Sequence, residues 1–209
     1  MRSRYVSAAA TALDLVESDP VAAAWERESA LEGFTVGGLA GHIAAQVHST
    51  REALDGDFAG KERIGLFEHF ERAAWRGADL GNEINTRVRE GGQAAAEAGP
   101  AALVADTRRA LAAVEAALPG RDGDETSGNP YWAYATSLDD FLVTRILEFV
   151  VHSDDLACSV GSPMPVFDAE VFDTAAWVLT RLSAGRHGQA ALVRALSRSE
   201  RAGGDITAL

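Results

Sequence analysis

The segment from residue 137 to residue 160 constrains the fold of this chain more than any other. When it is read as a helix, at about 100° per residue, its apolar side chains cover nearly the whole circumference. A helix that is apolar on all sides is usually buried on all sides, so other helices must surround this one. The chain is rich in alanine, and only 7% of its residues are aromatic, which favours helices over sheets. We therefore expect an all-α fold.

Other segments can supply the surrounding helices. Residues 119–130 read as a polar, Gly-rich loop, and a short helix carries Trp25. Thr35 and Ser137 are suitable N-caps, and the pair Gly37-Gly38 either weakens its helix or permits close packing against another one. Periodicity predicts further helices over residues 3–18, 35–54, 62–97, 101–118, 168–184 and 189–200.

Four polar residues interrupt the apolar surface of the helix at 137–160. Arg145, Glu148, His152 and Asp155 share one narrow stripe, at spacings of three, four and three residues. Burying such groups without partners is costly, so they need partners, a metal ion or a water-filled cavity. The spacing of Glu148 and His152 lets a carboxylate oxygen and an imidazole nitrogen reach one ion. Many helices carry this pair by chance, so the pair alone is a weak indication.

A third ligand has to come from a facing helix, and His42 is the candidate. It lies in the apolar helix at 35–54, on a stripe with Leu39 and Gln46. Two histidines and one carboxylate on facing helices, with a fourth position open, are what a catalytic zinc site requires. The alternative for His42 is a core histidine bonded to a backbone carbonyl.

The other histidines and the single cysteine are weaker candidates. His48 lies off the His42 stripe, His69 lies in a polar helix and His187 precedes a glycine, so each reads as solvated or locally bonded. Cys158 is rotated away from the polar stripe and reads as a packing residue. A lone cysteine cannot form an internal disulfide, which fits a reducing compartment.

The formal net charge of −12 argues against nucleic acid and membrane surfaces as partners. No signal-peptide pattern follows the N-terminus, and no apolar run approaches the ~20 residues that span a bilayer. We expect a cytoplasmic protein whose partners are small molecules. A homodimer stays open, because the sequence does not decide the oligomeric state.

Two motifs surround the candidate ligands. One is Phe34-Thr35-Val36-Gly37-Gly38-Leu39-Ala40-Gly41-His42-Ile43, and the other, from Thr144 to Ala157, follows Arg-x-x-Glu-x-x-x-His-x-x-Asp-Leu. In this order they resemble the N-terminal domain of mycothiol-dependent maleylpyruvate isomerases, a family of the DinB-like superfamily. The resemblance implies a DinB-type up-and-down four-helix bundle over residues 1–165, and residues 166–209 form a short helical C-terminal extension.

The resemblance also implies a divalent metal, usually zinc, held by His42, Glu148 and His152. In this family the metal activates the thiol of mycothiol, a small sugar-cysteine thiol, and the thiolate attacks an electrophile. Some members isomerise a cis double bond and others transfer the thiol. After Gly161 only some 48 residues remain, too few for the full C-terminal domain of the isomerases. The resemblance therefore does not extend to maleylpyruvate as the substrate.

Asp155 and Arg145 are the candidate catalytic residues. Asp155 can orient the imidazole of His152, or it can bond nearby backbone at the end of its helix. Arg145 can pair with a carboxylate of the stripe, which is the interpretation we favour, or hold a substrate carboxylate.

Gln46, Arg194 and Arg198 are the candidate cofactor-binding residues. Gln46 shares the His42 stripe. The segment from Ala191 to Arg198 resembles a C-terminal signature of shorter relatives, and its two arginines can close over the pocket. The alternative for these arginines is a solvated helix face.

We therefore predict a metal-dependent enzyme that uses mycothiol as cosubstrate to attack a small electrophilic substrate, as an S-transferase or a cis-trans isomerase. Two alternatives remain. One is a metal-dependent hydrolase or lyase of the same fold, in which water replaces the thiol. The other is a non-catalytic bundle that binds a metal or a metabolite.

Overall fold

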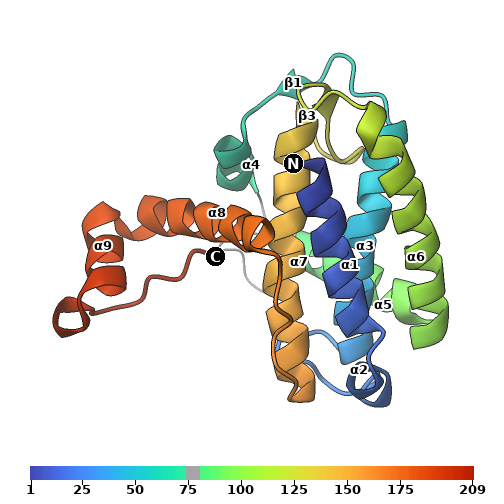
Figure 1. The fold of residues 1–209 in the computed structure, drawn as a ribbon, viewed down its shortest axis with the longest axis horizontal. Coiled ribbons are helices and arrows are strands. Elements are labelled where there is room, and N and C mark those ends of the chain that lie inside the picture. The colour runs from blue at the N-terminus through green and yellow to red at the C-terminus, as the bar shows by residue number, and fades with distance from the viewer. Residues whose placement is uncertain (74–80) are drawn as a thin grey trace.

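Four long helices form the core of the structure, a computed structural model that describes residues 1–73 and 81–209. Fully buried side chains such as Leu13, Ile43, Val114 and Ile146 fill the space between them. The all-α bundle predicted from the sequence is therefore confirmed. The four helices are α1 (Arg2–Val16), α3 (Val36–Asp55), α6 (Pro100–Ala117) and α7 (Leu138–Val160) (Figure 1).

The four helices form two parallel pairs instead of alternating strictly in direction. Beyond the end of α6, Arg121 donates a hydrogen bond to the carbonyl of Leu54 near the end of α3 (2.8 Å). Ahead of both helices, Trp25 donates to the carbonyl of Ala96 (3.3 Å). α3 and α6 thus run the same way, and α1 and α7 run together in the other direction (Figure 1). The reason is that the segment between α3 and α6 returns to the end of the bundle where α3 begins.

That returning segment differs from the single helix predicted over 62–97. It contains β1 (Glu62–Arg63), α4 (Leu66–Arg72) and α5 (Glu83–Ala96), while residues 74–80 of the prediction lie outside the described residues. β1 pairs in parallel with β3 (Tyr134–Ser137), and β2 (Thr126–Ser127) pairs antiparallel with its other edge. These strands were not predicted, because two to four residues are too few to show a period of two.

The C-terminal helices leave the bundle. α8 (Ala169–His187) crosses α7 and extends away from it, and α9 (Gln189–Ser197) lies at its far end (Figure 1). Gly188, at a φ of 86°, separates the two helices. The short elements are α2 (Asp19–Ala23) and the 3-10 turns η1 (Leu118–Gly120) and η2 (Ser199–Arg201). Among the described residues, no helix is both long enough and apolar enough to cross a membrane.

Candidate metal centre

Three side chains from two facing helices converge in the bundle. His42 projects from α3, and Glu148 and His152 project from α7. The Oε2 atom of Glu148 lies 3.2 Å from Nε2 of His42 and 3.1 Å from Nε2 of His152. One ligand atom from each residue lies within 4.8 Å of the others. The side chains are 14%, 20% and 17% exposed, so the cluster is partly open to solvent.

The two distances from the Glu148 oxygen suit ligands of one metal ion. Bonds of 2.0–2.1 Å at tetrahedral angles place two ligand atoms about 3.3 Å apart. The two separations from the Glu148 oxygen are close to that value. Imidazole nitrogen and carboxylate oxygen are also donors that zinc accepts. The residues present therefore fit a divalent ion, and His42, Glu148 and His152 are the residues that would hold it.

Local sequence sets the position of both helices. The Thr35 hydroxyl accepts a hydrogen bond from the amide of Gly38 (2.9 Å), and the Ser137 hydroxyl accepts one from the amide of Asp140 (3.0 Å). Both predicted N-caps are confirmed. Each cap satisfies an amide that the first turn of its helix leaves without an intrahelical partner. The caps fix where α3 and α7 begin, and thereby where the ligands lie along them.

Glycines bring a third helix against the backbone of α3 beside His42. A Cβ added at Gly41 would meet the carbonyl oxygen of Gly92 on α5, and one added at Gly92 would meet that of Gly38, both closer than 3.0 Å. The close packing predicted at Gly37-Gly38 is therefore present. A Cβ added at Gly37 would meet the side chain of Trp25. The tightest contacts, at Gly41 and Gly92, were not predicted from the sequence.

Asp155 lies directly behind His152. Its Oδ2 is 2.9 Å from Nδ1 of His152, on the side of the imidazole that faces away from Glu148. Burial alone would lower the pKa of His152, but the hydrogen bonds with Asp155 and Glu148 outweigh it and raise that pKa to about 9. This contact keeps Nε2 of His152 directed at the cluster.

Glu148 and His42 respond to the same surroundings. Burial tends to raise the pKa of Glu148, but hydrogen bonds from His152 and His42 outweigh this and hold it well below its usual range. Burial lowers the pKa of His42. A carboxylate and a neutral imidazole are the forms that ligate metals, so both residues are in the state that binding requires.

Arg145 does not form the ion pair that the sequence favoured. Its Nη1 donates to Oε1 of Gln46 (2.6 Å) and its Nε to the hydroxyl of Thr144 (3.1 Å). The guanidinium carbon lies 5.8 Å and 5.1 Å from the ring centroids of Trp132 and Phe141. The side chain therefore reaches α3 and these rings, and its hydrogen-bond partners are neutral. Only 9% of Arg145 is exposed.

Gln46 links this arginine to the first ligand. Its amide nitrogen lies 2.9 Å from the carbonyl oxygen of His42 and 3.4 Å from Nε2 of the same residue. Because its oxygen accepts from Arg145, the amide is oriented with its nitrogen towards His42. The structure thus brings Gln46, Arg145 and Asp155 to the ligand cluster.

It does not bring Arg194 and Arg198 there. Both are exposed on or just after α9, at the far end of α8 from the bundle (Figure 1). The extension leads away from the ligands instead of folding over them. Of the two sequence interpretations, an exposed helix face describes these arginines. Cys158 is exposed as well, so its interpretation as a packing residue is wrong.

The other histidines divide between surface and core. His48 faces Asp106 at 3.5 Å, and His187 faces the carbonyl oxygen of Thr207 at 2.8 Å. His69, expected to be solvated or locally bonded, is only 4% exposed, and its Nδ1 lies 2.9 Å from the hydroxyl of Tyr134. Burial lowers its pKa to about 4. Leu66 and Phe70 lie three residues before and one residue after His69 and share its buried face. This spacing was the sequence signal that could have predicted the burial of His69.

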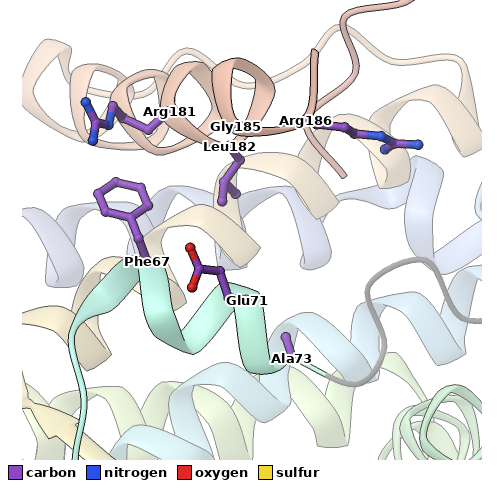
Figure 2. Close-up of a pocket in the computed structure, with 7 residues that line it drawn as sticks. All are labelled: Phe67, Glu71, Ala73, Arg181, Leu182, Gly185 and Arg186. Carbon is purple, nitrogen blue, oxygen red and sulfur yellow. The ribbon is translucent and has the colours of Figure 1, made fainter. Parts of the chain in front are cut away.

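A cavity of about 570 Å³ lies apart from the ligand cluster, between α4 and α8. Figure 2 shows Phe67 facing Arg181 across it, with Glu71 directed into the space. None of the three candidate ligands lines this cavity, so it gives no support to the metal centre. The candidate site rests on the convergence of the ligands.

Comparison with known proteins identifies the family. The family described as mycothiol maleylpyruvate isomerase N-terminal domain matches residues 6–157, which include all three candidate ligands. No curated protein and no solved structure matches the chain. Because the match covers most of the chain, the chain belongs to this family.

Proposed function

We propose that this family member is a metal-dependent enzyme that uses mycothiol to attack a small electrophile, as an S-transferase or a cis-trans isomerase. The observation that carries the proposal is the convergence of two imidazoles and one carboxylate from α3 and α7. The family description supports mycothiol as the thiol. The class of electrophile follows from the chemistry, because a thiolate adds to activated double bonds and displaces leaving groups.

His42, Glu148 and His152 would hold the ion, and zinc is our first choice because it accepts this ligand set. A bound ion of this kind would favour the thiolate form of a thiol that reaches it, and the thiolate is the nucleophile. Asp155 holds His152 in the orientation that ligation needs, and Nε2 of His152 would give up its proton when the ion binds. Gln46 donates a hydrogen bond to the carbonyl oxygen of His42 and so holds the backbone of α3 at this ligand.

Arg145 would act on the electrophile. Its partners Gln46 and Thr144 are neutral, so its charge is not cancelled by a contacting carboxylate. When a thiolate adds to a conjugated double bond, its electron pair ends as negative charge on the electrophile. A fixed cation beside the site stabilises that charge without having to reorganise.

The test compares thiols and matched histidine variants. Zinc-loaded wild type is assayed against conjugated alkenes, epoxides and haloarenes, with mycothiol, with glutathione and without thiol. His42→Ala should lose both metal and turnover. His48→Ala, on the same helix but paired with Asp106, should keep both. Equal metal content and activity in the two variants would remove His42 from the site.

The two alternative functions give different outcomes when esters and amides are added to the panel. Turnover of esters or amides without any thiol would replace the proposal with a hydrolase. Metal binding without turnover of any electrophile would leave a binding protein. Zinc at 100 times its dissociation constant should stabilise the wild type by about 2.7 kcal/mol, or roughly 5–10 °C in the midpoint of melting. Glu148→Ala should abolish that shift.

A further inference from the structure

The C-terminal extension forms an arm, residues 166–209, whose direction is fixed at its base. Trp177 packs against Phe67 of α4 with ring centroids 5.1 Å apart, and the guanidinium of Arg181 lies 5.3 Å from the same ring. Figure 2 shows Arg181 facing Phe67. These contacts hold α8 against α4, so α9 is carried away from the bundle (Figure 1).

The tip of the arm exposes an apolar face. Val193 and Leu196 on α9 are 62% and 70% exposed, whereas Leu192, which packs inward, is 9% exposed. The two exposed side chains are three residues apart and therefore share one face of the helix. Arg194 follows Val193 in α9, and Arg198 is the residue that ends the helix. An amphipathic helix normally buries its apolar face, so this face is suited to a contact with another surface.

The charge of the tip is opposite to that of one end of the bundle. Residues 186–201 contain four arginines and one acidic residue, whereas residues 17–32 contain five acidic residues and one arginine. The acidic residues of the second segment are exposed: Glu17, Asp19, Glu26, Glu28 and Glu32. Pro20, Ala22 and Ala23 of α2 are exposed too, and they offer small apolar surface among these charges.

These two surfaces cannot meet within one molecule. In Figure 1, α2 lies at the foot of the bundle and α9 lies at the far end of the arm. Because the base of the arm is packed on α4, the tip cannot fold back to α2 without breaking the contacts of Trp177 and Arg181. Complementary surfaces that are separated in one chain can join only between two chains.

We propose that two copies of this chain form a dimer in which the arm tip of each copy, residues 186–201, docks on residues 17–32 of the other. Two reciprocal contacts of this kind close a two-fold assembly, so no further copies are recruited. The apolar face of α9 is buried against α2, and the arginines meet the acidic residues at the rim. A membrane is a poorer partner for this tip, because the chain as a whole carries a net charge of −12.

The test is a charge exchange followed by sedimentation velocity and light scattering on the full chain. The wild type should be a dimer. Arg194→Glu with Arg198→Glu should raise the dimer dissociation constant at least tenfold, and so should Glu26→Arg with Glu28→Arg. Combining all four substitutions should bring it back towards the wild-type value, because the opposed charges are exchanged. The matched control, Arg87→Glu with Arg109→Glu on exposed faces of α5 and α6, should leave it unchanged.

Circular dichroism verifies that each variant folds, and Val193→Ser with Leu196→Ser tests the apolar face independently of charge. A monomeric wild type would overturn the proposal. A dimer that persists in the Val193→Ser, Leu196→Ser variant would also overturn it, since the docking surfaces would lie elsewhere. The same holds if the combined charge exchange does not restore the dimer. Sedimentation of a monomeric wild type with anionic phospholipid vesicles would assign the tip to a membrane instead.

Discussion

Replacing Gly92 by alanine should destabilise the protein, although alanine is the better helix former. Gly92 lies in the interior of α5, where it is buried against α3. An added Cβ would lie 2.4 Å from the carbonyl oxygen of Gly38 and 3.3 Å from the backbone nitrogen of His42. Backbone atoms cannot rotate aside as the end of a side chain can, so the two helices have to separate.

The expected magnitude follows from two opposed terms. Raising the 2.4 Å contact to the 3.0 Å that real Cβ atoms keep requires a separation of about 0.6 Å. Overpacking of this kind typically costs about 1–3 kcal/mol. The helix itself gains about 0.5–1 kcal/mol when glycine becomes alanine. We therefore expect a net loss of roughly 1–2 kcal/mol for Gly92→Ala.

The neighbouring glycine supplies the control. Gly91 is an interior residue of the same helix, and among the described residues an added Cβ there meets nothing within 4 Å. Gly91→Ala should therefore stabilise the protein by about 0.5–1 kcal/mol. Urea unfolding followed by circular dichroism measures both variants. If Gly92→Ala proved as stable as Gly91→Ala, the close approach of α5 to α3 would be wrong.

Three further predictions concern the metal centre and its surroundings. Asp155→Asn should weaken zinc binding about 10–100-fold by calorimetry, because His152 loses the carboxylate that orients it. In metal-free protein, the free energy of unfolding should fall as the pH rises from about 6.5 to about 9. The reason is that protonated His152 stabilises the folded state below its raised pKa, and this contribution is lost above that pKa. Denaturant titrations across this range should show the fall in wild type and a smaller one in Asp155→Asn. Cys158→Ala should leave turnover with mycothiol unchanged, because Cys158 is exposed and the attacking sulfur belongs to mycothiol. Loss of turnover with intact metal content would point to a nucleophile on the protein.

The sequence predicted the bundle and the ligand cluster because both depend on short spacings. Thr35 and Ser137 mark helix starts through a cap that acts within three residues. Glu148, His152 and Asp155 converge because they share one face of a single helix. His42 lies on a different helix, so spacing alone could not predict that it joins Glu148 and His152. The motif around His42 supplied that prediction.

The parts that were missed depend on contacts between distant segments. Arg145 was assigned an acidic partner from its own helix, but its guanidinium reaches Gln46, 99 residues earlier in the chain. His69 is buried because Trp132 and Tyr134, just before and at the start of β3, arrive from a distant part of the chain. The position of Arg194 depends on how α8 packs on the bundle, which no local pattern encodes.

The ligands of the candidate metal centre are far apart in the chain, and this has a consequence for biosynthesis. His42 precedes Glu148 by 106 residues. At 5–20 residues per second, a ribosome needs about 5–20 s to add that stretch, and α7 must then leave the exit tunnel. During this time His42 is present without the other two ligands. Capture of an ion by this centre would therefore have to follow the synthesis of α7, and a nascent chain that stops before α7 would present His42 as a lone imidazole.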